Sequence, residues 1–117
     1  MLIKFEEAKV GIVLPNYNSE LYLAETIESI IKQTFKNWKL TIVDGNSNLE
    51  TKKILENYRT HPKINIINLI KNKKAGFCRN LAMRNSDSDF IAFIDSDDIW
   101  DKEKLSKQIN FMIKNNY

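Results

Sequence analysis

The sequence is poor in the residues that define several classes of protein. Its one cysteine, Cys78, excludes a disulfide within the chain, and its single histidine, His61, leaves too few ligands for a zinc finger. Three glycines and two prolines exclude collagen-like and linker sequences. The apolar runs are far too short to cross a bilayer, and no secretory signal is visible. We therefore expect a cytoplasmic protein in a reduced setting.

The composition is that of a globular domain. Of the 117 residues, 43% are hydrophobic, and 18 Lys and Arg stand against 15 Asp and Glu. This length fits one domain, or a piece of a larger protein, so we expect a single domain over residues 1–117. The small positive excess, with its lysines dispersed along the chain, argues for a phosphate-bearing ligand and against nucleic acid.

Short apolar runs rich in Ile and Val predict four strands that are covered on both faces. They are Val10–Leu14, Leu40–Val43, Ile64–Ile70 and Phe90–Ile94. Residues Met1–Lys9 are expected to form a short polar lead-in.

Helical spacing of apolar residues predicts a helix after each strand. The apolar positions are Leu23, Ile27, Ile30 and Ile31, then Ile54, Leu55 and Tyr58, then Phe77, Leu81 and Ala82, then Leu105, Ile109, Met112 and Ile113. Asn18 and Ser19 are candidate caps of the first helix, and the second is expected to begin near Asn48. Asp101 is the expected N-cap of the fourth, with Glu103 in its first turn.

This alternation of strands and helices predicts an α/β fold, a mainly parallel sheet with helices on both faces. Right-handed crossovers place every strand-to-helix loop at the carboxyl edge of the sheet, where ligands of such folds bind. The loops that meet there are residues 15–18, 44–48, 71–76 and 95–98.

An acidic cluster follows the fourth strand. Asp95, Asp97 and Asp98 repel one another unless a cation lies among them, and Mg²⁺ or Mn²⁺ suits such oxygen ligands. Equally, Asp95 and Asp98 could form an Asx-turn that caps the following helix. The residues alone leave both interpretations open.

Five motifs in register make the sequence similar to a known family. They are Val13–Asn18, Gln33–Phe35, Val43–Ser47, Gly76 with Arg79 and Asn80, and Phe93–Asp98. Together they resemble the nucleotide-sugar-binding, N-terminal half of family 2 glycosyltransferases of the Rossmann-like GT-A fold, over about Val10 to Leu105.

The resemblance implies inverting transfer of a sugar from a nucleoside diphosphate to an acceptor hydroxyl, in polysaccharide or glycan synthesis. The Asp-x-Asp motif, here Asp95-Ser96-Asp97, would bind the divalent metal and the donor ribose, with Asp97 the stronger metal candidate. The metal would neutralise the diphosphate leaving group. A uridine diphosphate sugar is the expected donor, and a glycan or lipid-linked molecule the expected acceptor.

The turn after the first strand would border the nucleotide through Pro15, Tyr17 and Asn18, with Tyr17 in the base pocket. Tyr17 could instead be an aromatic packed under the first helix. The family commonly has two aspartates after the second strand, whereas this chain has Asp44 and Gly45, which puts the usual base contact in doubt. Asp44 could take over that contact or simply be a turn residue.

Arg79 follows from the resemblance as a donor-binding residue that would reach the diphosphate or hold the acidic cluster in place. Three nearby lysines could add positive potential, although a solvated loop is the favoured interpretation: Lys71, Lys73 and Lys74. Cys78 is expected to be packed rather than nucleophilic, and His61 to lie in a surface turn.

The family's general base lies beyond the metal-binding motif, so we expect it to lie after Tyr117 and the chain to be a fragment. Parts outside the chain would bring it to the inner face of the membrane, and a truncated domain invites self-association. The alternative is a non-catalytic interaction or assembly domain that kept the GT-A fold.

Overall fold

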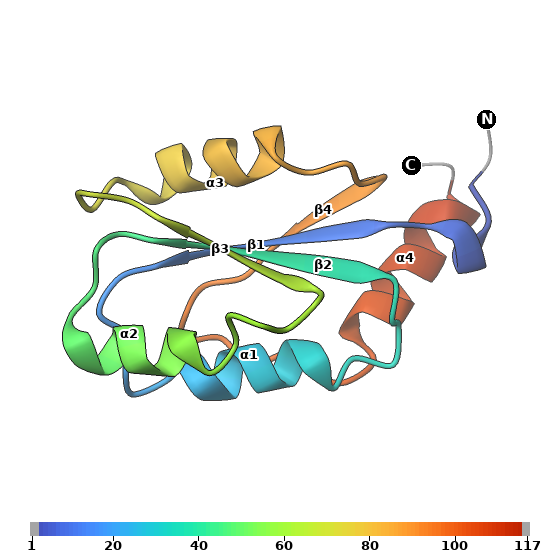
Figure 1. Cartoon of the computed structure of the whole chain (residues 1–117). Coiled ribbons are helices and arrows are strands. Elements are labelled where there is room, and N and C mark those ends of the chain that lie inside the picture. Colours follow the sequence, from blue (N-terminus) through green and yellow to red (C-terminus); the bar gives the residue numbers. More distant parts are fainter. Residues whose placement is uncertain (1–2, 116–117) are drawn as a thin grey trace.

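The computed structural model describes residues 3–115 and has an α/β architecture, as expected (Figure 1). Its elements are η1 (Phe5–Glu7), β1 (Val10–Asn16), α1 (Leu23–Ile31), β2 (Trp38–Asp44), α2 (Leu49–Glu56), β3 (Ile64–Asn68), α3 (Ala75–Arg84), β4 (Phe90–Phe93) and α4 (Lys104–Lys114). The four strands form one sheet in the order β3-β2-β1-β4, and every neighbouring pair is parallel.

β1 lies inside the sheet, between β2 and β4. Its pairing with β2 runs from Val10 opposite Trp38 to Asn16 opposite Asp44, and β4 pairs along its first half, from Val10 opposite Phe90. Five of the seven β1 residues, from Val10 to Leu14, are buried in unbroken succession. This is the pattern of a strand that is covered on both faces.

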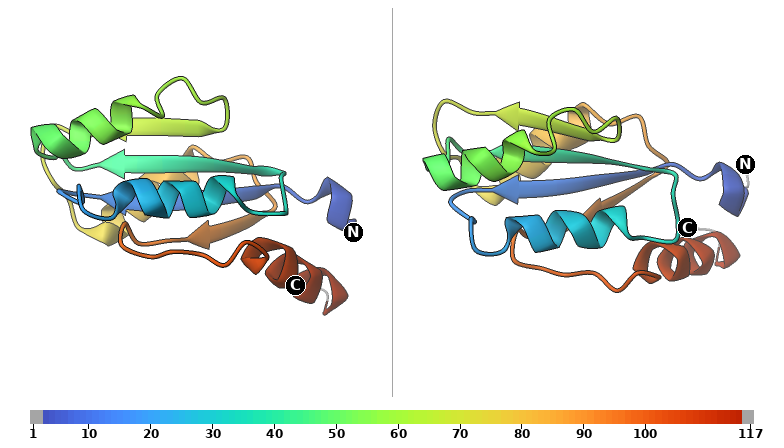
Figure 2. Two further views of the ribbon diagram at one scale, coloured as in Figure 1. Left: turned by 90° about the horizontal axis from the view of Figure 1, so that it is seen from below. Right: turned by 60° about the horizontal axis from the view of Figure 1, so that its bottom comes forward.

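The helices form a layer on each face of the sheet (Figures 1 and 2). α1 and α2 lie side by side on one face, α3 lies alone on the other, and α4 returns toward η1. The main core lies under α1 and includes residues of α4, whereas α3 covers a small second cluster. That second cluster consists of Val13, Val43, Cys78 and Ala82.

Two predicted helix starts are wrong. α1 begins at Leu23 after Tyr22, without a side-chain cap, because Asn18 and Ser19 are engaged elsewhere. α4 begins after Glu103 and not after Asp101, whose Oδ2 accepts the Glu103 N–H at 3.1 Å in the preceding turn. By contrast, α2 begins next to Asn48 as expected, and Asn48 caps it, its Oδ1 accepting the Thr51 N–H at 3.0 Å.

The strands differ from the expected ranges at their ends. β1 and β2 each continue to a polar residue that the apolar pattern did not include, Asn16 and Asp44. β3 stops at Asn68, two residues before Ile70, and β4 stops at Phe93. The polar lead-in contains η1, and its residues 1–2 lie outside the described part. In residues 3–115, no helix has the length and apolar character needed to span a membrane.

Candidate functional site

The parallel sheet brings the four strand-to-helix loops to one edge, as the sequence predicts. β1 lies between β2, the next strand along the chain, and β4, the last, so the chain order reverses between β1 and β4. Crevices at such a reversal are where ligands bind in open α/β sheets. The polar residues that end β1 and follow β4 are therefore placed at the expected ligand edge.

A buried hydrogen-bond network joins the ends of β1 and β2. Asp44 is fully buried, and its Oδ1 accepts from Asn16 Nδ2 at 2.9 Å while its Oδ2 accepts the Ser47 N–H at 3.2 Å. Asn16 in turn accepts from the Ser19 hydroxyl. The sequence left two interpretations of Asp44 open, and these contacts are those of a turn residue. A contact between Asp44 and a nucleotide base stays a prediction.

Asn18 links the same two turns. Its backbone has a positive φ of 47°, its N–H donates to Ser47 Oγ at 2.9 Å, and its side-chain oxygen accepts the Asn48 N–H at 2.7 Å. Tyr17, the preceding residue, is 49% exposed and so is not packed under α1. The turn is rigidly held while the Tyr17 ring remains accessible.

A hollow of about 310 Å³ lies between the β1 turn and the start of α3. Pro15 and Tyr17 line one side, and Asn72 lies on the other. The Asn72 side chain approaches the β2 turn so closely that a Cβ on Gly45 would lie 2.3 Å from its Oδ1. Glycine at position 45 is therefore what lets Asn72 approach this turn.

The acidic cluster forms an exposed turn at the end of β4. Asp98 Oδ2 accepts the Asp95 N–H at 3.3 Å, and the Asp98 N–H donates to the Asp95 carbonyl at 3.0 Å. Asp95 and Asp98 thus share a hydrogen-bonded turn, but it is not the predicted Asx-turn, because the Asp98 side chain accepts from the N–H three residues before it. Nor does the turn cap α4, which begins several residues later. The turn leaves the Asp95 and Asp97 side chains exposed.

Arg79 of α3 reaches this turn. Its guanidinium lies 3.5 Å from Asp95 Oδ1 and 5.4 Å from the centre of the Phe93 ring. The Arg79 Nε is buried and has no hydrogen-bond partner in the described structure. Of the two expected roles of Arg79, holding the acidic cluster is the one that these contacts provide.

The carboxylates of the described residues fit a metal only in part. Within residues 3–115, no group of three or more His, Cys, Asp or Glu side chains is gathered to hold an ion. Asp95 and Asp97 supply exposed oxygen ligands from one turn. Such a donor set suits Mg²⁺ or Mn²⁺, which commonly take one or two carboxylates together with substrate phosphates.

Three buried polar residues of α1 and the following turn hold the segment after β4 in place, and the sequence analysis assigned them no role. Thr26 donates to the Ser96 carbonyl at 3.0 Å, and Ser29 Oγ accepts the Trp100 N–H at 3.1 Å. Gln33 is fully buried and donates to the Asp101 carbonyl at 2.6 Å. The one signal in the sequence for this anchoring role was the place of Gln33 in the Gln33–Phe35 motif that resembles the family.

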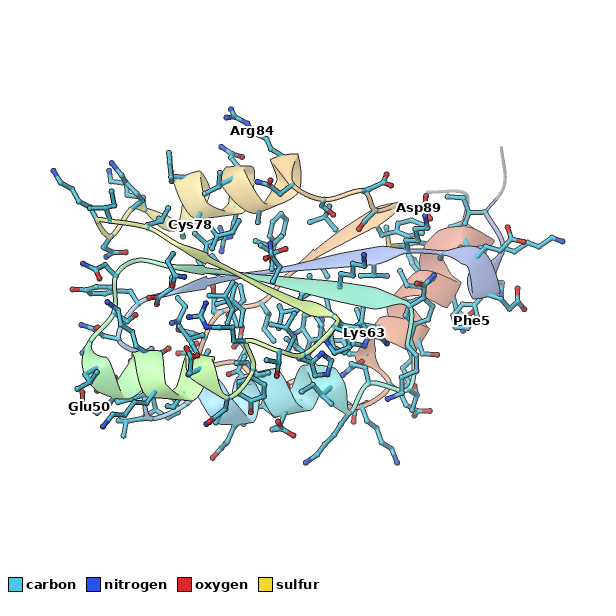
Figure 3. The ribbon with its side chains drawn as sticks, in the orientation of Figure 1. Phe5, Glu50, Lys63, Cys78, Arg84 and Asp89 are labelled. Carbon is cyan, nitrogen blue, oxygen red and sulfur yellow. The ribbon has the colours of Figure 1, made fainter. Side chains whose placement is uncertain are left out.

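The remaining candidates have ordinary roles. Cys78 points from α3 toward the sheet, and burial raises the pKa of its thiol, so it is packed as expected (Figure 3). Lys71, Lys73 and Lys74 form an exposed loop. The His61 Nδ1 accepts the Lys63 N–H at 3.1 Å in a turn.

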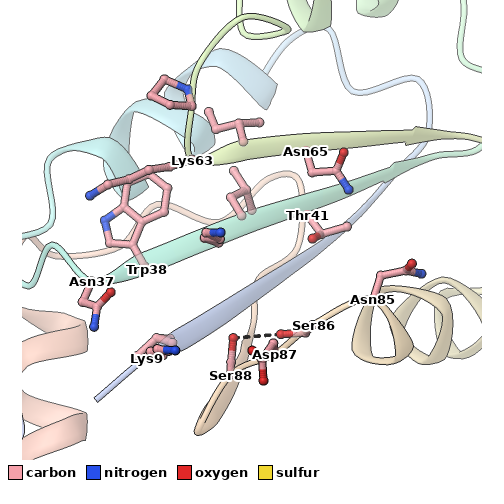
Figure 4. A pocket seen from close by; sticks show the side chains of 15 residues that line it. Lys9, Asn37, Trp38, Thr41, Lys63, Asn65, Asn85, Ser86, Asp87 and Ser88 are labelled. Atoms are coloured by element: carbon pink, nitrogen blue, oxygen red, sulfur yellow. Dashed lines mark hydrogen bonds between the residues drawn. The ribbon is translucent and has the colours of Figure 1, made fainter. Parts of the chain in front are cut away.

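A larger hollow, of about 430 Å³, lies at the opposite, amino edge of the sheet (Figure 4). The hollow exists because α3 covers only the carboxyl half of the sheet face on which it lies, so Thr41 and Asn65 remain accessible. The loop beside it is held by a hydrogen bond in which the Ser86 hydroxyl donates to Ser88 Oγ at 2.8 Å. No sequence motif leads into this hollow. It is remote from the loops that carry the predicted site.

Comparisons with known proteins agree with the fold and the motifs. The sequence profile described as Glycosyl transferase family 2 matches residues 11–117. A curated relative, the *Escherichia coli* UDP-Glc:alpha-D-GlcNAc-diphosphoundecaprenol beta-1,3-glucosyltransferase WfgD, is 41% identical over 108 residues, which is 92% of this chain and 42% of the relative. The chain thus spans about two fifths of the curated relatives it matches first.

Solved structures are also similar. Staphylococcus aureus TarS 1-349 in complex with UDP-GlcNAc superposes with a TM-score of 0.85 and 32% identity, over 92% of this chain and 32% of that chain. The mannosyltransferase PcManGT from *Pyrobaculum calidifontis*, in complex with GDP-Man and Mn²⁺, gives a TM-score of 0.82 at 19% identity, over 90% of this chain and 32% of that one. The second likeness concerns the fold alone.

Proposed function

The chain belongs to glycosyltransferase family 2, and we propose that it is the donor-binding part of an inverting glycosyltransferase. The ligand would be a nucleoside-diphosphate sugar, seated at the carboxyl edge of the sheet. The observation that carries this proposal is the exposed Asp95–Asp97 turn beside Arg79, at the same edge of the sheet as the hollow lined by Tyr17. UDP-GlcNAc bound to TarS supports this class of ligand.

The diphosphate is proposed to lie against the acidic turn with a divalent cation between them. Asp97 would be the main protein ligand, and Asp95 and Ser96 would face the ribose or the same cation. When bound, Mg²⁺ or Mn²⁺ supplies positive charge that stabilises the departing diphosphate. Arg79 orients Asp95 through their ion pair, which fixes one carboxylate before the donor arrives.

The nucleoside is proposed to enter the hollow between Pro15 and Asn72. The accessible Tyr17 ring offers a surface on which a base can stack, and Asn18 holds the turn. Asp44 is fully buried, so we propose that it supports the turn and that the Asn72 amide contacts the base in its place. A uridine nucleotide is the first donor to test.

The rest of the reaction belongs to the whole protein and is also proposed. The chain is one domain, residues 1–117, and we assign the general base to no residue within it. The acceptor would be a glycan or a lipid-linked molecule, as the name of WfgD indicates for that relative. We propose that the protein acts in the cytoplasm at the inner face of the membrane.

The proposal is tested by thermal unfolding and calorimetry with UDP, UDP-GlcNAc and GDP-mannose, each with and without Mn²⁺. Binding near saturation should raise the free energy of unfolding by about 1–3 kcal/mol. Asp97→Ala should remove the part of this gain that depends on Mn²⁺. Asp87→Ala is the matched control, because Asp87 is exposed in the loop beside the amino-edge hollow.

Two results would contradict the proposal. If Asp97→Ala keeps the full Mn²⁺-dependent gain, the metal site is assigned to the wrong residue. If no nucleotide raises the stability of the unmodified chain, the alternative of an interaction or assembly domain without a ligand is the better account.

A further inference from the structure

The acidic residues of the chain are unevenly distributed. Residues 57–86 contain seven Lys and Arg and no Asp or Glu, whereas the rest of the chain has eleven Lys and Arg against fifteen Asp and Glu. This segment includes β3, the loop after it and α3. The side of the molecule that carries α3 is therefore positive, although the net charge of the whole chain is small.

Exposed apolar residues lie among these cations. Ile70 is 91% exposed and Phe77 is 49% exposed, and Figure 3 shows Arg84 pointing outward from α3, away from the sheet. We call this surface the α3 face. Its members are Ile70, Lys71, Lys73, Lys74, Phe77 and Arg84.

The backbone around Ile70 is fixed, so its exposure is not that of a loose loop. The Ile70 carbonyl accepts from Asn46 Nδ2 at 3.1 Å, and the Leu69 N–H donates to the Asp44 carbonyl at 2.8 Å. A β-branched apolar side chain is thus presented to solvent next to Lys71. Burial of this side chain against a partner would remove its apolar surface from water, a gain that the chain on its own leaves unused.

Two other exposed apolar residues, Leu21 and Leu49, lack this charge pattern. Leu21 is 77% exposed and Leu49 is 64% exposed, but each stands next to a glutamate in the sequence, Glu20 and Glu50. An anionic partner would be repelled there and attracted at the α3 face. Charge therefore favours the α3 face over these two positions for such a partner.

We infer that the α3 face docks on an anionic membrane surface. Lysines beside exposed Ile and Phe match a bilayer interface, where the cations meet lipid phosphates and the apolar side chains enter the acyl boundary. A nucleic acid would use the cations but leave Ile70 without a partner. Docking would bring the carboxyl edge close to the bilayer, because the 71–74 loop borders the hollow at that edge. The inference does not depend on nucleotide binding.

The test is flotation with vesicles of phosphatidylcholine alone and of phosphatidylcholine mixed with phosphatidylglycerol. The protein should bind only the mixed vesicles, and added salt should weaken binding. Lys71→Gln, Lys73→Gln and Lys74→Gln combined should lower the partition coefficient about a hundredfold. The control is a second triple variant, which combines Lys53→Gln, Lys107→Gln and Lys114→Gln. It changes the net charge by the same amount as the first, but at exposed sites on α2 and α4.

A second variant tests the apolar part. Ile70→Ser should weaken binding to the mixed vesicles about tenfold or more at unchanged charge, and its far-ultraviolet circular dichroism should match that of the unmodified chain. Three results would each overturn the inference. They are an equal loss of vesicle binding in the two triple-lysine variants, equal binding of the protein to both vesicle types, and tighter binding to single-stranded RNA than to the mixed vesicles. Because no nucleotide is present, these results are separate from the test of donor binding.

Discussion

Replacing Gln33 tests whether the segment after β4 is held by buried hydrogen bonds. Gln33 is fully buried, donates to the Ser29 carbonyl at 3.2 Å and to the Asp101 carbonyl at 2.6 Å, and accepts the Leu105 N–H at 3.1 Å. Gln33→Met keeps most of the volume but removes all three bonds. Each is worth about 1 kcal/mol, and unsatisfied backbone groups add to the cost, so we expect a loss of about 3 kcal/mol.

The loss is measured by urea unfolding, with the slope of the transition expected to stay constant because the fold is unchanged. Gln108→Ala is the control, since Gln108 is exposed on α4. It should change the free energy of unfolding by less than about 0.5 kcal/mol. If Gln33→Met costs no more than the control does, the three hydrogen bonds do not stabilise the segment and the reasoning fails.

Two further predictions concern the β2 turn and a half-buried tyrosine. Gly45→Ala should destabilise the protein by about 1–3 kcal/mol, because the added Cβ would overlap Asn72. Gly76→Ala has open space around it and should stabilise α3 by about 0.5–1 kcal/mol. Urea unfolding measures both variants, and equal effects would contradict the close approach of Asn72 to Gly45. Burial and a hydrogen bond to Glu28 raise the pKa of Tyr58 to about 12, above its usual value near 10. The protonated phenol therefore stabilises the folded state below pH 10, and this contribution is lost as the pH rises from 10 to 12. Tyr58→Phe should remove one late tyrosinate transition from the absorbance titration and reduce the loss of stability over that range; an unchanged titration would contradict the assigned pKa.

The sequence predicts the order of elements and the parallel sheet because both follow from local patterns. Apolar runs such as Val10–Leu14 and the helical spacing of Leu23 and Ile27 depend on neighbours in the chain. The predicted caps of α1 were wrong because Asn18 bonds to Asn48, thirty residues further on, while the Ser19 hydroxyl bonds back to Asn16, which Asp44 of β2 holds in turn. Local propensity does not contain such partners.

The candidate site was predicted as a set of loops but not as a set of contacts. The motifs identified Asp95 and Arg79, and the structure brings them within 3.5 Å. The burial of Asp44 and the approach of Asn72 to Gly45 depend on how the β3 loop lies over the β2 turn, which no periodicity encodes. These tertiary contacts decide which polar groups remain free for a ligand.

The position of β1 has a consequence for how the protein is made. β1 lies between β2 and β4 in the sheet of the described residues, and β2 is synthesised well before Phe90, where β4 begins. Until then, a run of aliphatic side chains and a row of unpaired backbone groups stay open on the nascent polypeptide. Slow passage through this stage would favour aggregation, so chaperones that shield nascent apolar segments should matter most for this chain before residue 90 is added.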